Sequence, residues 1–318
     1  MEYILSKNNR TFYMGISMLL IIGYHILLLL SDNILNKTLW LPFKSIFNHG
    51  YIGVDIFFFL SAYGLCHSFE KSTIIQFLKK RALRILPTYI LFLIVCCIFF
   101  IQAPISIRCS ESLLQLSGLS VFHTKYTNTN FMQGEWFTPA IINLYILFPL
   151  LYYTTSLISK KFKKNGQICL LLVAIIFTHL LYPYISGLYI TRLPIIIIGI
   201  LTYINIKNND DKLLTILYVC AALLSFCIGR DVVKYSLLIP LLLKGISLTH
   251  YIPNTKDTFR LINWIGIHSF EIYLAQSICM AACVKQNIYF TIFAMTIGIL
   301  IASTPFIFIS SYIKHLKL

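Results

Sequence analysis

Long apolar runs, each near the length that a helix needs to cross a bilayer, are the feature that most constrains this chain. A transmembrane helix requires about 20 consecutive, mainly apolar residues. The sequence contains about ten such runs, at residues 11–30, 52–69, 85–103, 138–158, 167–185, 189–206, 213–229, 235–249, 261–283 and 288–312. The runs are continuous rather than alternating, which excludes a closed β-barrel. The sequence therefore predicts an all-α, polytopic integral membrane protein.

The composition excludes a soluble protein and favours one domain. The chain is 58% hydrophobic and only 12% charged, with a mean hydropathy of +0.79, whereas a soluble domain is about 25% charged. No soluble block separates the apolar runs, so residues 1–318 are interpreted as a single membrane-embedded domain. The nine cysteines lie mostly in apolar runs, with only Cys109 clearly in a loop. They form no disulfide framework and no metal-binding pair, so we expect no metal site.

The net charge of +15 indicates membrane orientation rather than nucleic-acid binding. Cationic segments hold transmembrane helices against an anionic inner leaflet, and we expect no nucleic-acid partner. If the N-terminus is cytoplasmic, most of the 26 Lys and Arg residues fall on inner segments, including clusters at 79–84 and 160–164. This bias predicts that both termini lie in the cytoplasm.

One connection, from Pro104 to Glu135, is longer than the others. It is polar but contains an apolar stretch from Ser112 to Phe122. This pattern predicts a helix that lies at the outer membrane interface rather than one that spans the bilayer. Long loops often carry function, so this segment is a functional candidate.

Ionisable side chains inside a membrane are costly, so each is a functional candidate. His25 lies about 13 residues past the cytoplasmic end of the first run, or roughly 20 Å across the bilayer. Buried there it is expected to stay neutral, and a neutral imidazole can take a proton from a hydroxyl. The alternative is a structural histidine that bonds a neighbouring carbonyl. The other candidates in the membrane are Asp55, His179, Arg192, His268 and Glu271.

Two further segments combine polar residues with a helical pattern. Residues 50–64 contain small residues, three consecutive Phe, and Asp55 and Ser61; small residues permit close helix contact and the aromatic rings fill the space. Arg81 and Arg84 are three apart, so they are neighbours on one helix face at the predicted cytoplasmic boundary. Two guanidinium groups there can bind phosphates. The alternative, favoured on this cluster alone, is an anchor of the positive-inside type.

These segments, in this order, resemble the motifs of the acyltransferase family 3 membrane enzymes over nearly the whole chain. The matching motifs are Met14 to His25; Gly53-Val-Asp-Ile-Phe-Phe-Phe-Leu-Ser-Ala-Tyr63; Arg81-Ala-Leu-Arg84 with Pro87 and Tyr89; Trp136, Asn143, Tyr145 and Pro149; Arg192-Leu-Pro194 with Gly199; and Ser269-Phe-Glu-Ile-Tyr-Leu-Ala-Gln276. Each motif alone is weakly specific. Six of them in register form a strong resemblance.

The resemblance implies a multi-pass O-acyltransferase of a bacterial-type plasma or inner membrane. Such enzymes move an acyl group, often acetyl, from cytoplasmic acyl-CoA to a hydroxyl of a glycan or lipid-linked sugar. Acyl-CoA is a donor substrate, and no permanently bound cofactor is expected. His25 would be the general base, and Arg81 and Arg84 would hold the CoA phosphates. Substrate contacts would come from Asp55, Ser61, Trp136, Asn143, Arg192, Tyr273 and Gln276.

Four positions depart from the family pattern. Met14 stands where the family usually has a basic residue eleven positions before the histidine, and Arg10 lies one turn earlier on a similar face. Ile141 replaces a Glu that some branches of the family lack. Gln276 stands in place of a late-helix His, so it can still form hydrogen bonds but cannot titrate. Ala62 replaces a Gly of the second-helix signature.

Two other functions are weighed against acyl transfer. A transporter or flippase for a lipid-linked sugar would tend to show internal repeats and helices broken at the midplane, and the sequence shows neither. A non-catalytic member of the family would keep the fold while losing the chemistry, and Met14 is the departure that favours this alternative.

Overall fold

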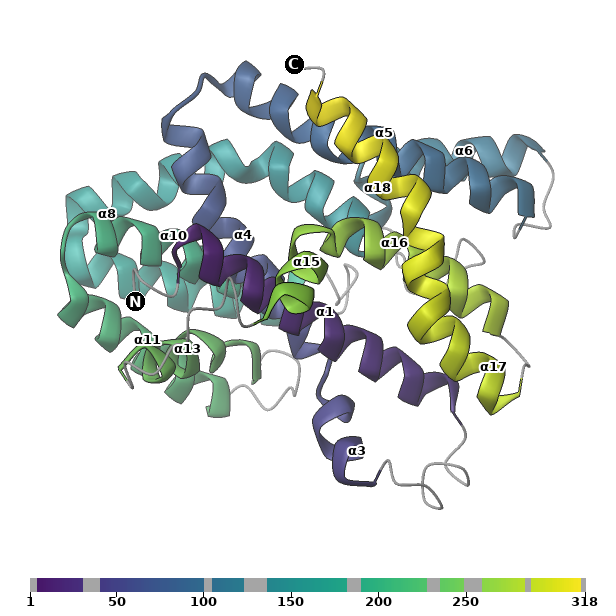
Figure 1. Cartoon of the computed structure of the whole chain (residues 1–318). Coiled ribbons are helices and arrows are strands. Elements are labelled where there is room, and N and C mark those ends of the chain that lie inside the picture. The colour runs from purple at the N-terminus through teal and green to yellow at the C-terminus, as the bar shows by residue number, and fades with distance from the viewer. Residues whose placement is uncertain are drawn as a thin grey trace. The chain divides into compact units, whose positions relative to one another are not determined.

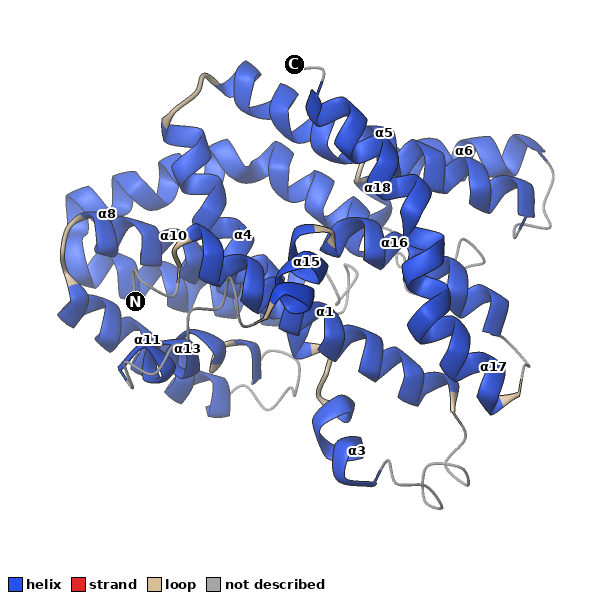
Figure 2. Cartoon of the chain, in the orientation of Figure 1, coloured by secondary structure: helices blue, strands red, loops and turns tan. Residues whose placement is uncertain are grey.

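All regular secondary structure in the described part of the chain is helical. The computed structural model describes residues 5–30, 41–99, 105–122, 136–181, 190–227, 235–248, 259–283 and 287–315. Within these ranges there is no strand, and Figure 2 shows blue helices joined by tan loops with no red arrow. A helix bonds its backbone polar groups within one segment, which the interior of a bilayer requires. The predicted all-α class is confirmed.

Helices occupy each of the ten predicted runs wherever those runs are described. Figure 1 shows them as α1 (Lys7–Leu29), α4 (Ile52–Glu70), α5 (Ile74–Phe99), α8 (Phe137–Leu181), α10 (Leu193–Lys207), α11 (Asp211–Cys227), α13 (Ile239–Leu248), α15 (Arg260–Ile267), α16 (Ser269–Cys283), α17 (Ile288–Phe293) and α18 (Ile299–His315). Five spans in the described ranges are long and apolar enough to cross a membrane, namely Asn9–Leu29, Ile52–Glu70, Ile74–Phe99, Phe137–Leu181 and Tyr289–His315. These spans support a multi-pass membrane protein. Ten crossings and cytoplasmic termini stay predictions.

Four of the predicted runs, the fourth, fifth, ninth and tenth, have different boundaries in the structure. The fourth and fifth runs form the single element α8, whose backbone is interrupted at Lys163 with φ of 45° and ψ of −132°. This interruption lies inside the lysine cluster that was predicted as an inner connection. The ninth run is divided at His268 between α15 and α16. The tenth passes through the π-helix η2 (Ala294–Gly298) before α18.

Helices also occur outside the predicted runs. The short helix α3 (Leu41–Asn48) was not predicted. In the long connection, α6 (Ile105–Leu116) and the 3₁₀-helix η1 (Leu119–Phe122) confirm helical structure in the apolar stretch; its position at the membrane surface stays a prediction. Cys109 lies on α6, so its assignment to a loop was wrong, because the helix begins before the apolar stretch. Pro104 and residues 123–135 are outside the described residues.

The helices form two compact units. Unit 1 comprises Met1–Ser17, Ile52–Ile74 and Leu147–Ile267, and unit 2 comprises Met18–Tyr51, Ile75–Ile146 and His268–Leu318. Both α1 and α8 contribute to both units. The assignment of all 318 residues to a single domain stays a prediction, and the units are described separately.

The centre of unit 1 is the packing of α10 along α4. Gly199 of α10 faces Ala62 and the carbonyl of Phe59, and a Cβ at Gly199 would lie 2.8 Å from both. Only glycine therefore permits this separation, as expected for small residues between membrane helices. On the other side of α10, Leu201 packs with Leu213 and Leu217 of α11. Thr11 of α1 donates a hydrogen bond to Asn263 of α15, with Oγ1 and Oδ1 3.1 Å apart.

Unit 2 is built around α5 and the helix pair α16 and α18. The Phe92 ring stacks on Tyr89 at 5.8 Å and lies 6.5 Å from the Phe306 ring of α18. The opposite face of α5 presents Ile90, Ile94 and Ile98, which are all exposed. An exposed aliphatic face on a spanning helix indicates contact with lipid. Unit 2 therefore has an internal aromatic core and a surface suited to the bilayer.

Candidate functional site

His25 lies on α1 in unit 2 and contacts a residue far away in the sequence. The imidazole is half-buried, and its Nδ1 is hydrogen-bonded to Nε2 of Gln276 on α16. The ring also hydrogen-bonds the backbone of Ile21, one turn earlier on α1. An amide nitrogen only donates, so Nδ1 accepts this bond and the ring carries its N–H on Nε2, which is the arrangement of a structural histidine. With the amide turned by 180°, Oε1 of Gln276 accepts from Nδ1–H and the lone pair of Nε2 is left for a base.

Gln276 is the polar partner of His25. Its side chain is 1% exposed, and its Oε1 has no hydrogen-bond partner among the described residues. A buried amide oxygen without a partner is uncommon and costs free energy. This oxygen can accept a hydrogen bond from a hydroxyl brought close to His25. The family pattern identified Gln276 as a candidate, and the structure brings it to His25.

Aromatic rings continue from this pair along α16 and the start of α8. Tyr273, nearly one turn before Gln276, is buried and lies 5.1 Å from the Phe137 ring. Phe137 in turn meets Trp136 edge-on at 6.3 Å. Asn143, further along α8, is also buried. In unit 2, Phe137 therefore links Trp136 to Tyr273, and Gln276 lies nearly one turn further along α16. The sequence did not indicate Phe137, because this residue lies outside the family motif.

The two arginines of α5 differ in their surroundings. The Arg81 guanidinium lies over two rings, 5.3 Å from the centroid of Phe77 and 5.9 Å from that of Tyr145. Arg84 is exposed. Cation–π contact fixes a guanidinium while leaving its charge in place. Arg81 is therefore held by the helix packing, whereas Arg84 presents its charge outward.

Asp55 and Arg192 form a buried ion pair in unit 1. Oδ1 of Asp55 on α4 lies 3.0 Å from Nε of Arg192, which immediately precedes α10, and the side chains are 0% and 2% exposed. Arg192 Nη1 also donates to Thr191 Oγ1 at 2.6 Å. Ser61, two turns after Asp55 on α4, is half-buried. Both charges were candidates from the sequence, but nothing in the sequence indicated that they pair.

The structure also places Arg10, the nearest basic residue to the unusual Met14. A Cβ added at Gly64 of α4 would lie 2.5 Å from Nη1 of Arg10. The guanidinium therefore lies directly over the backbone of α4, inside unit 1. That Arg10 takes the place of the basic residue that the family usually has at Met14 stays a prediction.

A polar cluster at the end of α4 was not predicted. Glu70 accepts hydrogen bonds from the hydroxyl groups of Tyr152 and Tyr203, the latter at 2.8 Å. Lys207 Nζ donates to both Glu70 oxygens at 2.8 and 2.7 Å. The cluster joins the C-terminal ends of α4 and α10 to the interior of α8, which is a structural role. Its sequence signal was an acidic residue that ends an apolar run.

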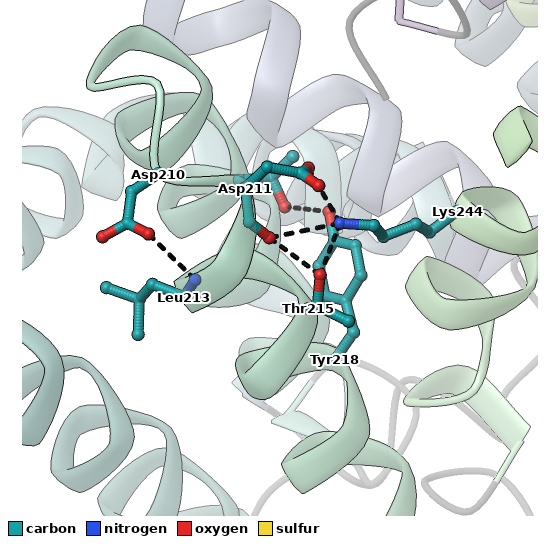
Figure 3. Close-up of polar contacts among 7 residues, drawn as sticks. Asp210, Asp211, Leu213, Thr215, Tyr218 and Lys244 are labelled. Atoms are coloured by element: carbon teal, nitrogen blue, oxygen red, sulfur yellow. Dashed lines mark hydrogen bonds and ion pairs between the residues drawn. The ribbon is translucent and has the colours of Figure 1, made fainter.

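A second unpredicted network surrounds Lys244 of α13. Figure 3 shows its Nζ between the carboxylate of Asp211, 2.8 Å away, and Thr215 Oγ1, 2.6 Å away. The backbone oxygen of Asp211 accepts a third bond at 3.2 Å. Three acceptors satisfy all three donors of the ammonium group. This network joins α13 to the start of α11.

The chain was compared with protein families, curated proteins and solved structures. A family model described as an acyltransferase domain, Acyl_transf_3, matches residues 15–315. The matched range includes α1 from Gly15 onward and extends to the last residue of α18. No curated protein and no solved structure matches the chain.

Proposed function

The chain belongs to acyltransferase family 3, and from this premise we propose a specific reaction for a membrane acyltransferase. The donor is cytoplasmic acyl-CoA, with acetyl as the preferred group. The acceptor is a hydroxyl of a cell-surface polysaccharide or lipid-linked sugar, and the protein acts in a bacterial-type plasma or inner membrane. The observation that supports this proposal most is the contact of His25 with the buried Gln276.

In the proposed reaction, His25 accepts the proton of the acceptor hydroxyl as its oxygen bonds to the thioester carbonyl carbon. The carbon–sulfur bond then breaks, and the protonated imidazole returns the proton to the departing sulfur of CoA. Gln276 orients the ring and accepts a hydrogen bond from the acceptor. Trp136, Asn143 and Tyr273 form the acceptor side. A site without water strengthens these polar contacts.

Arg192 in this proposal stabilises the thioester carbonyl or the acceptor, with Asp55 fixing its position and Ser61 contributing a hydroxyl. The ion pair supports this role because the Asp55 carboxylate, 3.0 Å from Nε, holds the guanidinium in one position. Burying two charges costs free energy. Charged residues inside a membrane protein therefore often have a function, and the same expectation applies to this pair.

Replacing Arg84 with alanine is expected to raise KM for acyl-CoA by about tenfold, the effect of losing one charged hydrogen bond. The turnover number should change little, because the arginine would bind the CoA phosphates away from the reacting carbonyl. Steady-state kinetics at varied acyl-CoA concentration measure both quantities.

Lys80→Ala is the matched control, since Lys80 is exposed on the same helix. It should leave KM near its original value. Equal effects of the two substitutions would identify the cluster as a general positive-inside anchor. Arg81→Lys keeps the charge but loses the guanidinium contacts with Phe77 and Tyr145. This variant should therefore lower the thermal stability of the protein.

Replacing Gln276 with methionine is expected to lower the turnover number by about 10- to 100-fold, the loss that is typical when the hydrogen-bond partner of a metal-ligating histidine is removed. Methionine retains the volume of the side chain and removes its hydrogen bond. Gln276→His restores the family residue and should retain most of the activity. If both variants lose activity equally while KM for acyl-CoA is unchanged, the hydrogen bond to His25 is not what positions the ring.

The function is tested by mass spectrometry of surface glycans from cells with and without the gene. Ester-linked acyl groups are expected only when the gene is present, and they should be absent with His25→Ala. Unchanged acylation would remove the enzyme proposal. Solute flux into proteoliposomes without acyl-CoA would instead favour a lipid-linked sugar transporter.

A further inference from the structure

An apolar groove lies between α5 and α6, with all of its lining residues in unit 2. Its volume is about 750 Å³, and its aliphatic walls include Ile90, Leu93, Ile94, Ile98, Leu113 and Leu116. The volume falls within the range of about 300–1,000 Å³ that is typical of ligand sites. No charged side chain lines it. The chemistry of the walls therefore selects a hydrocarbon.

Polar contacts hold α6 beside α5, so the groove does not depend on apolar packing across it. Tyr89 Oη donates to Gln115 Oε1 at 3.2 Å, and Ser120 Oγ donates to the same oxygen at 3.2 Å. Cys97 Sγ and Ser112 Oγ are 3.4 Å apart. The buried Tyr89–Gln115–Ser120 bonds fix α6 and η1 to the wall of α5. The groove is thus formed before any ligand binds.

The groove is continuous with the surface that α5 presents to the bilayer. Ile94 and Ile98 line it and are also exposed, so a chain can enter sideways from lipid. Its position along α5 is equally informative. Leu93 lies nine residues beyond Arg84, or about 14 Å at 1.5 Å per residue. The groove and the arginine pair therefore occupy opposite parts of one helix.

The inner wall of the groove connects to the surroundings of His25 through packed residues. Gly118, which follows α6 with φ of +74°, lies against the backbone of Pro139 and Asn143, 3.1 Å from each for an added Cβ. Two residues before Pro139, Phe137 packs on Tyr273. Less than one turn further along α16, Gln276 bonds to His25. The groove and the His25–Gln276 pair therefore lie at the two ends of one packed row of residues within unit 2.

We propose that this groove binds the hydrocarbon tail of a lipid-linked sugar, so that the acceptor is anchored in the bilayer and its sugar hydroxyl is delivered toward His25. The inference rests on the proposed acyl transfer for its choice of head group. Donor phosphates at Arg84 and an acceptor tail in the groove would approach from opposite ends of α5. This separation is what transfer from a cytoplasmic donor to an outward-facing acceptor requires.

The test uses the full-length protein in nanodiscs of phosphatidylethanolamine and phosphatidylglycerol. The probe is a polyprenyl-diphosphate-linked monosaccharide with a diazirine in its tail, and a diazirine phospholipid serves as the competitor. After irradiation, peptide mapping should place the polyprenyl tail on α5 and α6 at least fivefold above the phospholipid. Equal labelling would overturn the proposal and assign the groove to ordinary bilayer lipid.

Leu113→Trp fills the groove, and Leu157→Trp on α8 is the matched control because the two leucines are 67% and 66% exposed. Leu113→Trp should reduce labelling about tenfold and raise KM for the lipid-linked acceptor about tenfold, while transfer to a short, water-soluble glycoside is unchanged. Leu157→Trp should change none of these. Equal loss with both acceptors would overturn the proposal. Labelling needs no acyl-CoA, so failure of acyl transfer itself would be recognised separately.

Discussion

Replacing His25 with alanine is expected to lower acyl transfer by about 100- to 10,000-fold, the usual contribution of a general base. The protein should still accumulate in the membrane, because the half-buried imidazole is a small part of the α1 interface. The measurement is the initial rate of acyl transfer from acyl-CoA by purified protein, normalised to the amount of monodisperse material. His49→Ala is the control, since His49 is exposed and its Nδ1 hydrogen-bonds the backbone oxygen of Ser45, one turn earlier.

A second substitution at this position separates catalysis from structure. His25→Gln can keep hydrogen bonds to Ile21 and Gln276 but cannot accept a proton at neutral pH. If His25 is the base, this variant should be as inactive as alanine. If it retains most of the activity, His25 is a structural histidine and the proposed mechanism is wrong. The bond to Ile21 makes this comparison necessary.

Removing either member of the Asp55–Arg192 pair is expected to destabilise the protein by about 3–5 kcal/mol, because the remaining charge is buried without its counter-ion. Asp55→Ala and Arg192→Ala should each lower the midpoint of thermal unfolding in detergent. The double variant should lose less than the sum of the two, since it leaves no isolated charge.

Lys207→Ala provides the comparison for a charge that is more accessible to solvent. Lys207 is 58% exposed and pairs with Glu70, and such pairs contribute about 0–1 kcal/mol. The unfolding midpoint should therefore move far less than with Arg192→Ala. Strictly additive losses in the Asp55 and Arg192 variants would mean that the two buried charges do not interact. Retained stability with lost activity would assign the pair to substrate contact alone.

The sequence was sufficient to identify the candidates because membrane burial makes charged groups rare. His25, Asp55 and Arg192 stood out as ionisable residues in apolar runs, and Gln276 through its position in a family motif. Their partners could not be identified, because His25 and Gln276 are 251 residues apart. Phe137 and Lys244 were overlooked for the same reason, since their roles depend on neighbours from other helices.

The sequence by itself determined the all-helical class, the location of the long apolar helices and the resemblance to the family. These properties depend on local hydropathy and on motifs, because a bilayer requires each spanning segment to bond its own backbone. The tertiary structure alone decided that Asp55 pairs with Arg192, that Gln276 meets His25, and that polar bonds from Gln115 hold a groove open beside α5. Such contacts depend on how distant helices pack, and helix packing is governed by the shape of facing side chains rather than by hydropathy.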